Sequence, residues 1–188
     1  MIRPQLWVFA GPNGAGKSTL VDRYVRGRIP VVNPDTIALS LDSALDDTAR
    51  ILRAGRIALR ERAELLAARQ SFGVETTLTG HAELDLMRAA GQAGFKVNLV
   101  YVGLRNVRNS ISRVRHRVAR GGHDVPQADL LRRFDRSIAN LPKAITLSDR
   151  AILFDNSGRW PRLLLVREGD RARFTATTLP PWAARVLE

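Results

Sequence analysis

The chain alternates short apolar runs with longer segments in which apolar residues recur every three or four positions. This alternation is typical of strands separated by helices, and it indicates a mostly parallel sheet with helices on both faces. The segments that we interpret as strands are at 5–10, 29–32, 71–76, 97–102 and 151–154. The run at 97–102 is apolar at every position except Asn98, as expected for a parallel strand buried on both faces. We therefore expect an α/β fold.

Six segments between these runs have helical spacing. The expected helices run from a glycine-rich stretch to about 26, around 36–43, and over 47–69, 81–93, 106–120 and 126–142. Asp46 or Asp47 is a suitable cap for the third helix, and Gly94 closes the fourth. Pro126 suits the first turn of the sixth helix, and Pro142 either ends or kinks that helix.

The last two of these helices are amphipathic. The apolar stripes consist of Val107, Ile111, Val114 and Val118 in the first, and of Leu130, Leu131, Phe134, Ile138 and Leu141 in the second. On the first helix Arg113, Arg117 and Arg120 form a second stripe, about 120° away from the apolar one. These two helices with their intervening glycines form a helical unit at about 105–142.

The end of the chain has a different pattern. Segments 163–167 and 171–177 flank Glu168-Gly169-Asp170, which predicts a β-hairpin within about 161–178 at one edge of the sheet. A chain of 188 residues fits one domain, 1–188, and no internal repeat or linker divides it.

The stretch after the first strand is Gly11-Pro12-Asn13-Gly14-Ala15-Gly16-Lys17-Ser18, which fits the P-loop pattern G-x-x-x-x-G-K-[ST]. Its glycines let successive N–H groups point at phosphate oxygens, and the following helix adds its positive end. We expect an exposed Lys17 side chain that reaches the β- and γ-phosphates of ATP, and a Ser18 hydroxyl that ligates Mg²⁺. The predicted nucleotide-binding residues are Gly11, Pro12, Asn13, Gly14, Ala15, Gly16, Lys17, Ser18 and Thr19. The alternative is an ordinary glycine-rich turn.

Carboxylates follow two other strands, and ligands of open parallel sheets bind outside the carboxyl ends of the strands. Phosphoryl transfer requires a group that orients or deprotonates the acceptor, and Asp35 is our candidate; alternatively it is a turn residue. Glu75 either holds the acceptor, serves Mg²⁺ through water, or is a solvated strand end. Thr77 either donates to substrate or caps a helix. No apolar run ends in the four-hydrophobics-plus-Asp form of a Walker B strand, so the carboxylate that serves the metal stays open.

The helical unit at 105–142 resembles a lid that brings arginines over bound phosphates. Arginine suits this role because its planar fork binds phosphate oxygens at two points and stays charged. Arg120 precedes Gly121-Gly122, and Arg132 and Arg133 follow them. Each arginine is alternatively a surface residue. His123 is better interpreted as a residue that locks the loop than as an acid or base.

Composition narrows the function classes. The net charge is +12, but only three of the 30 basic residues are lysine and aromatic residues make up 6%. We therefore favour a basic surface with a local phosphate-binding cluster over a nucleic-acid interface, which stays an alternative. The absence of cysteine excludes disulfides and thiolate metal sites. No apolar run of 18 residues and no signal-like start are present, so we expect a cytoplasmic protein without membrane contact.

Taken together, these motifs resemble the zeta toxin family of P-loop kinases. The matching features over about 5–158 are the P-loop, Asn33-Pro34-Asp35, Glu75-Thr76-Thr77 and the arginine-rich lid. The short zeta-toxin-like branch in particular is similar to Arg117-Val118-Ala119-Arg120-Gly121-Gly122-His123-Asp124-Val125-Pro126, followed by Arg133-Phe134 and Asn140-Leu141. Two positions depart from the family pattern, with Ala38 in place of an arginine and Thr76 in place of a glycine.

The resemblance implies a P-loop kinase fold and transfer of the ATP γ-phosphate to the 3'-hydroxyl of UDP-N-acetylglucosamine. It assigns the base to Asp35, the substrate-holding carboxylate to Glu75 and a nearby hydroxyl to Thr77. Arg120 and Arg133 then correspond to the phosphate-binding lid arginines, with Arg117 as an alternative for the first. It also raises an antitoxin protein as a partner. The competing functions are a nucleotide-switched nucleic-acid-binding ATPase and a polynucleotide or antibiotic kinase on the same fold.

Overall fold

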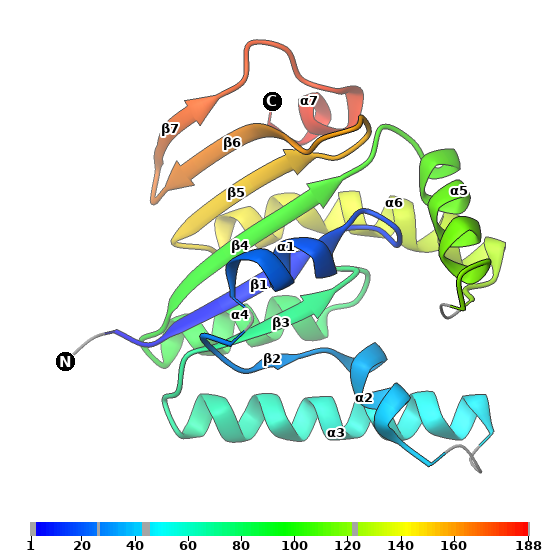
Figure 1. Cartoon of the computed structure of the whole chain (residues 1–188). Coiled ribbons are helices and arrows are strands. Elements are labelled where there is room, and N and C mark those ends of the chain that lie inside the picture. The colour runs from blue at the N-terminus through cyan, green and yellow to red at the C-terminus, as the bar shows by residue number, and fades with distance from the viewer. Residues whose placement is uncertain (1–2, 26, 43–45, 122–123, 188) are drawn as a thin grey trace.

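A seven-stranded sheet forms the centre of the computed structural model, which describes residues 3–25, 27–42, 46–121 and 124–187 (Figure 1). The strand order is β2-β3-β1-β4-β5-β6-β7. The strands are β1 (Gln5–Ala10), β2 (Val31–Val32), β3 (Phe72–Thr76), β4 (Lys96–Gly103), β5 (Arg150–Asp155), β6 (Arg162–Glu168) and β7 (Arg171–Thr175). The first five are parallel, whereas β6 and β7 are antiparallel and form the predicted hairpin at the edge.

Helices lie on both faces of the sheet, as expected. They are α1 (Lys17–Tyr24), α2 (Pro34–Ser40), α3 (Asp47–Ala67), α4 (Ala82–Gln92), α5 (Val107–Val118), α6 (Gln127–Thr146) and α7 (Pro181–Leu187). Helix α1 covers one face, while α4, α6 and α7 cover the other, and α5 stands beyond the carboxyl ends of the strands (Figure 1). Because successive strand residues point to opposite faces, Phe9 packs with α1, and Leu6 and Val8 pack on the other side.

Local sequence signals explain most boundaries. The Asp46 side chain accepts a hydrogen bond from the N–H of Ala49 at 2.9 Å, which caps α3 as predicted. Gly94 follows α4 with a φ of 80°, a value that favours glycine. On α5, Val114 is buried and packs with Val125 and Leu130, which confirms the predicted apolar side of that helix.

Helix α6 corrects three expectations. It continues through Pro142 to Thr146, because its last turn buries Ala144 and Ile145 against the sheet and this packing outweighs the missing N–H. Pro126 is the N-cap residue and not a first-turn residue. Leu131 is 43% exposed, since it lies 100° around the helix from the buried Leu130.

One helix was not predicted, and some predicted boundaries cannot be compared with the structure. Helix α7 was not predicted because it is only seven residues long, yet Trp182 and Ala183 bury its inner side. The expected end of the first helix at Arg26, the last residue of the segment 36–43, and the loop residues Gly122 and His123 lie outside the described residues.

Candidate functional site

The P-loop joins β1 to α1 with the backbone bends that its glycines allow. Gly11 has a φ of 140°, and a Cβ there would lie 2.2 Å from the carbonyl oxygen of Val102 on β4. Gly16 has a φ of 94°, and its Cβ would lie 2.7 Å from the side-chain amide of Asn156. Both positions therefore need glycine for two reasons, the left-handed backbone and the close neighbours.

Lys17 is held inside this loop. Its ammonium donates to the carbonyl oxygens of Gly11 at 2.9 Å and Pro12 at 3.1 Å, and the residue is buried, so the expectation of an exposed side chain is wrong. The reason is that the side chain folds back from the first residue of α1 onto the carbonyls at the start of the loop. Burial lowers the pKa of Lys17, while the carboxylates of Glu75 and Asp35 act in the opposite direction. Both predicted carboxylates therefore lie within electrostatic range of the ammonium.

A chain of hydrogen bonds joins the P-loop to the second and third strands. Ser18 Oγ donates to Glu75 Oε1 at 2.8 Å, and Asn33 Nδ2 donates to Glu75 Oε2 at 3.0 Å. The other end of the Asn33 amide, Oδ1, accepts the Asp35 N–H at 2.9 Å and thereby caps α2. The structure thus brings Ser18, Glu75 and the start of the Asp35 helix together. Asn33 was part of the motif Asn33-Pro34-Asp35, but the sequence predicted no role for its side chain.

The oxygens of Ser18 and Glu75 suit a small hard cation. Because the Ser18 hydroxyl donates its proton to Glu75, its lone pairs are left to face a metal, and the carboxylate can hold a metal-bound water. No group of three or more His, Cys, Asp or Glu side chains gathers in the part of the chain that the structure describes. This sparse set fits Mg²⁺, which keeps waters and takes phosphate oxygens in place of an all-protein cage.

The position of β3 in the sheet explains why the sequence did not identify the carboxylate that serves Mg²⁺. Glu75 is the last residue but one of β3, which pairs directly with β1, and its residue partner there is Phe9. Strand β3 contains Gly73 and is short of the four-hydrophobic run that a Walker B search requires. Glu75 could have been identified if β3 had been known to pair with β1, but the order of the strands along the sequence does not reveal this pairing.

Thr77 lies just beyond the same strand. Its hydroxyl is 3.1 Å from that of Thr79, while the Thr76 hydroxyl accepts the N–H of Leu78 at 3.0 Å. Helix α4 begins at Ala82 with His81 as its N-cap residue, so the interpretation of Thr77 as a helix cap is wrong. Its hydroxyl stays a candidate for substrate contact.

Three further side chains contact the P-loop from outside and were not assigned to the site. Ser110 and Arg113 come from α5, and Asn156 comes from the segment after β5. Ser110 belongs to neither the apolar stripe nor the arginine stripe of α5, so no pattern in the sequence pointed to it. Asn156 follows a strand end at the expected ligand edge, and this position was the one available signal for it.

The lid arginines differ in their surroundings. Arg117 lies close enough to Lys17 for its charge to lower the pKa of that lysine further. A hollow of about 440 Å³ lies along the second half of α5 and the residues just after it, and it is lined by Arg113, His116, Arg117, Arg120 and Gly121. Arg133, on α6, forms an ion pair with Asp129 of the same helix at 3.7 Å. The structure therefore gathers Arg117 and Arg120, and the role of Arg133 toward phosphate stays a prediction.

The chain is similar to proteins of a known family. A family model described as an AAA domain (AAA_33) matches residues 6–138, which include the P-loop, Asp35, Glu75 and α5. The chain belongs to this AAA domain family. An uncharacterized protein of Haemophilus influenzae is 32% identical over 134 residues, which are 68% of this AAA domain chain and 95% of that protein.

Solved structures share the fold at low identity. A chain of the AvrRxo1-ORF1:-ORF2 complex crystallised with ATP is 19% identical, with a TM-score of 0.73, over 90% of this chain and 60% of that one. A chain from the PezAT chromosomal toxin-antitoxin system of Streptococcus pneumoniae is 14% identical, with a TM-score of 0.67, over 100% of this chain and 83% of that one. The AAA domain chain thus has a P-loop NTPase/kinase fold, and it spans about 60% of the AvrRxo1 chain.

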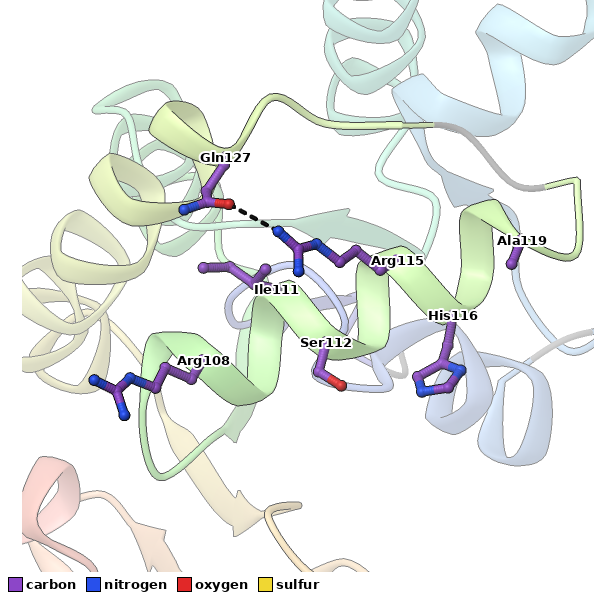
Figure 2. A pocket seen from close by; sticks show the side chains of 7 residues that line it. All are labelled: Arg108, Ile111, Ser112, Arg115, His116, Ala119 and Gln127. Carbon is purple, nitrogen blue, oxygen red and sulfur yellow. Dashed lines mark hydrogen bonds between the residues drawn. The ribbon is translucent and has the colours of Figure 1, made fainter.

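A second hollow, of about 490 Å³, lies on another side of α5 in this AAA domain. Figure 2 shows that its side chains diverge, because Arg115 reaches Gln127 of α6 whereas Ser112 and His116 point to the other side of the helix. The Arg115 guanidinium donates to Gln127 Oε1 at 3.1 Å. Polar groups that do not converge are a poor match to a ligand site, so the phosphate site is assigned to the P-loop.

Helices that span membranes need about 20 mostly apolar residues. Among the helices of the described residues, none combines the length and apolarity that crossing a membrane requires.

Proposed function

We propose that this AAA domain is an ATP- and Mg²⁺-dependent phosphotransferase that moves the γ-phosphate of ATP to a hydroxyl of a small acceptor. The observation that carries the proposal is the hydrogen-bonded chain from Ser18 through Glu75 and Asn33 to the start of the Asp35 helix, beside the buried Lys17. A P-loop alone fits many nucleotide-binding proteins. Asp35 adds a second carboxylate beside the P-loop, and this one can orient or deprotonate the acceptor hydroxyl.

Each residue then has a distinct task. The N–H groups of the P-loop bind the phosphates, and Lys17 neutralises charge on the β- and γ-phosphates. Ser18 and Glu75 hold Mg²⁺, which neutralises phosphate charge when bound. Asp35 is exposed at the start of α2, where its carboxylate accepts the proton of the acceptor hydroxyl. Arg117 and Arg120, with Arg133 from α6, bind the moving phosphoryl group.

UDP-N-acetylglucosamine is the acceptor that we propose first. Support comes from the resemblance of Asn33-Pro34-Asp35 and Glu75-Thr76-Thr77 to the zeta toxin motifs. In this proposal Glu75 and Thr77 bind the sugar as well. An antitoxin protein is the proposed partner, since a similar fold occurs in the PezAT toxin-antitoxin system.

The test is a transfer assay with ATP labelled at the γ-phosphate. Purified protein and Mg²⁺ are incubated with nucleotide sugars, with 5'-hydroxyl oligonucleotides and with hydroxylated antibiotics, and labelled products are separated. We expect a labelled nucleotide sugar with the parent and none with Lys17→Ala. A labelled oligonucleotide or antibiotic would replace the acceptor, and the absence of any labelled product would overturn the kinase proposal.

A nucleotide-switched ATPase that binds nucleic acid is the second candidate. The observation that favours it is Trp160, which is 74% exposed and has the Arg159 guanidinium 5.8 Å from its ring centre, a pairing suited to stacking on bases. Binding of random single-stranded RNA whose affinity falls steeply with salt, without labelled small product, would support it over the kinase.

A further inference from the structure

The carbonyl oxygens of the P-loop all have hydrogen-bond partners. Lys17 satisfies those of Gly11 and Pro12, and the N–H of Leu20 satisfies that of Gly16. The three in the middle are bonded from outside the loop. Their partners are Ser110 Oγ to Asn13 O at 2.7 Å, Arg113 Nη1 to Gly14 O at 3.4 Å and Asn156 Nδ2 to Ala15 O at 2.8 Å. We call Ser110, Arg113 and Asn156 the outer brace.

Holding these carbonyls fixes the direction of the peptide groups. In a peptide, the C=O and the N–H that follows it point in opposite directions, so carbonyls drawn outward turn N–H groups inward. The N–H groups of Asn13, Gly14 and Gly16 donate no hydrogen bond to any residue in the described part of the chain. These N–H groups are therefore available to a polyphosphate.

We propose that the outer brace positions the P-loop peptides and thereby sets the affinity of this site for polyphosphate. The proposal rests on the proposed function, because it assumes that the loop binds the phosphates of ATP. Ser110 and Asn156 act here as positioning residues, since they hold the peptides whose N–H groups, those of Gly14 and Gly16, face the ligand. Arg113 holds the peptide between them, whose N–H on Ala15 donates to the carbonyl oxygen of Pro12 at 3.2 Å and closes the turn of the loop.

The brace also fits the glycines. A Cβ on Gly14 would lie 3.0 Å from the Arg113 Cβ and 3.2 Å from the Ser110 carbonyl oxygen, so α5 packs directly on the loop. Asn156 approaches Gly16 in the same way. Helix α5 and Asn156 can approach the loop this closely only because Gly14 and Gly16 have no side chains. These two glycines therefore serve packing on the outside of the loop as well as phosphate binding on its inside.

Helix α5 is thereby coupled to the phosphate site. Ser110, Arg113 and Arg117 lie on successive turns of α5, and Arg120 follows just after the helix ends at Val118. Arg113 also donates to the carbonyl of Gly158 at 3.4 Å, so it ties the segment after β5 to the same helix. A ligand that orders the loop should therefore also order α5 and its arginines.

The experiment measures the affinity for inorganic tripolyphosphate with Mg²⁺ by calorimetry. We expect Ser110→Ala and Asn156→Ala each to weaken binding about 5- to 10-fold, the scale of one hydrogen bond, while the proteins stay folded. Arg113 is left unchanged because removing its charge would weaken polyphosphate binding by itself.

Matched controls separate positioning from stability. Ser137→Ala removes a buried serine that bonds Tyr101 at 3.1 Å, and Asn98→Ala removes a buried asparagine near Gln5 at the opposite end of the sheet. Both should lower the melting temperature and keep the parent affinity. Equal affinity loss in the controls would mean that the brace variants act through stability, which would overturn the proposal.

Hydrogen exchange of α5 provides the second measurement. We expect tripolyphosphate to protect the N–H groups of 107–118 in the parent, and to protect them less in Ser110→Ala at a concentration that saturates both proteins. Brace variants with parent affinity and parent protection would overturn the brace while leaving the proposed function intact. A parent that does not bind tripolyphosphate, or binds it as well after Lys17→Ala, would overturn both.

Discussion

Asn33 links the two residues on which the proposed transfer depends. Its amide nitrogen donates to the carboxylate of Glu75, and its amide oxygen accepts from the backbone N–H of Asp35. The strand-end rule predicted that Asp35 and Glu75 would share an edge of the sheet. It did not predict this link, because the partner of a side chain depends on neighbours that are 42 positions away in the sequence.

Asp35→Asn should keep ATP affinity and lower transfer to the acceptor by about 10²-fold or more, since the amide cannot accept the hydroxyl proton. Single-turnover transfer and nucleotide binding are measured on the same samples, with Asp170→Asn in the hairpin turn as the control. Loss of ATP binding together with transfer would place Asp35 at the metal instead.

Lys17 should give the stability a specific pH dependence. Burial lowers its pKa below 10.5 in the folded state, so the unfolded chain binds the proton more tightly. Stability then rises with pH between the lowered pKa and 10.5. We expect the free energy of unfolding of the parent, relative to Lys17→Met, to increase over this window in urea titrations. A difference that stays constant or falls with pH would contradict the burial of the charge.

At the scale of elements, α5 and α6 form the predicted helical unit, but the contacts of α5 with the P-loop make its first turns part of the nucleotide site. Periodicity predicted the helices and their buried faces. It did not predict which turn of α5 contacts the P-loop, because an amphipathic pattern fixes the buried side of a helix and not its position along its own axis.

Arg120→Ala and Arg133→Ala should each lower kcat more than they raise the KM for ATP, because contacts to the moving phosphoryl group strengthen in the transition state. The expected loss is about 10² to 10³ in rate. Arg133→Lys should recover little, since lysine lacks the two-point fork. Single-turnover rates are compared with Arg185→Ala on α7. Rates equal to the parent in all four variants would make these arginines surface residues.

Pro142→Ala should stabilise the fold. Pro142 lies inside α6, where it lacks an N–H and its ring crowds the preceding turn. The free energy of unfolding should rise by about 1 to 2 kcal/mol, less than the helix-propensity difference of about 3 kcal/mol because proline also restricts the unfolded chain. Urea unfolding is measured beside Lys143→Ala, a neighbouring exposed position. A loss of stability in Pro142→Ala would indicate a bend that the packing needs.

For the molecule as a whole, the strands and most helices were predictable from the sequence, and the correct edge hairpin with them. The strand at 97–102 shows why, since its residues are apolar except for Asn98, a pattern that requires burial on both faces, and the structure buries β4 between β1 and β5. What the sequence could not provide was contact between distant segments. Trp182 of α7, for example, packs on Tyr101 with ring centres 5.6 Å apart, and no local pattern joins these residues.

Gly103→Ala tests this packing. A Cβ at Gly103 would lie 2.2 Å from the Trp182 ring, so the ring and α7 would have to move. We expect a loss of about 1 to 3 kcal/mol in the free energy of unfolding, as for an overpacked core. Urea unfolding of Gly91→Ala, a position with open space beside it, provides the control and should match the parent or exceed it.

The strand order has a consequence for the newly made chain. Strand β1 is made before both of its partners, 72–76 and 96–103, and residues up to Asn156 bond the loop that follows it. Pairing with distant partners is slow, and domains fold as units during synthesis. The strand that carries the P-loop therefore gains its two partners only after residues 76 and 103 have been made. A nucleotide that binds the loop can stabilise the folded domain, but its site is complete only after Asn156 has been made.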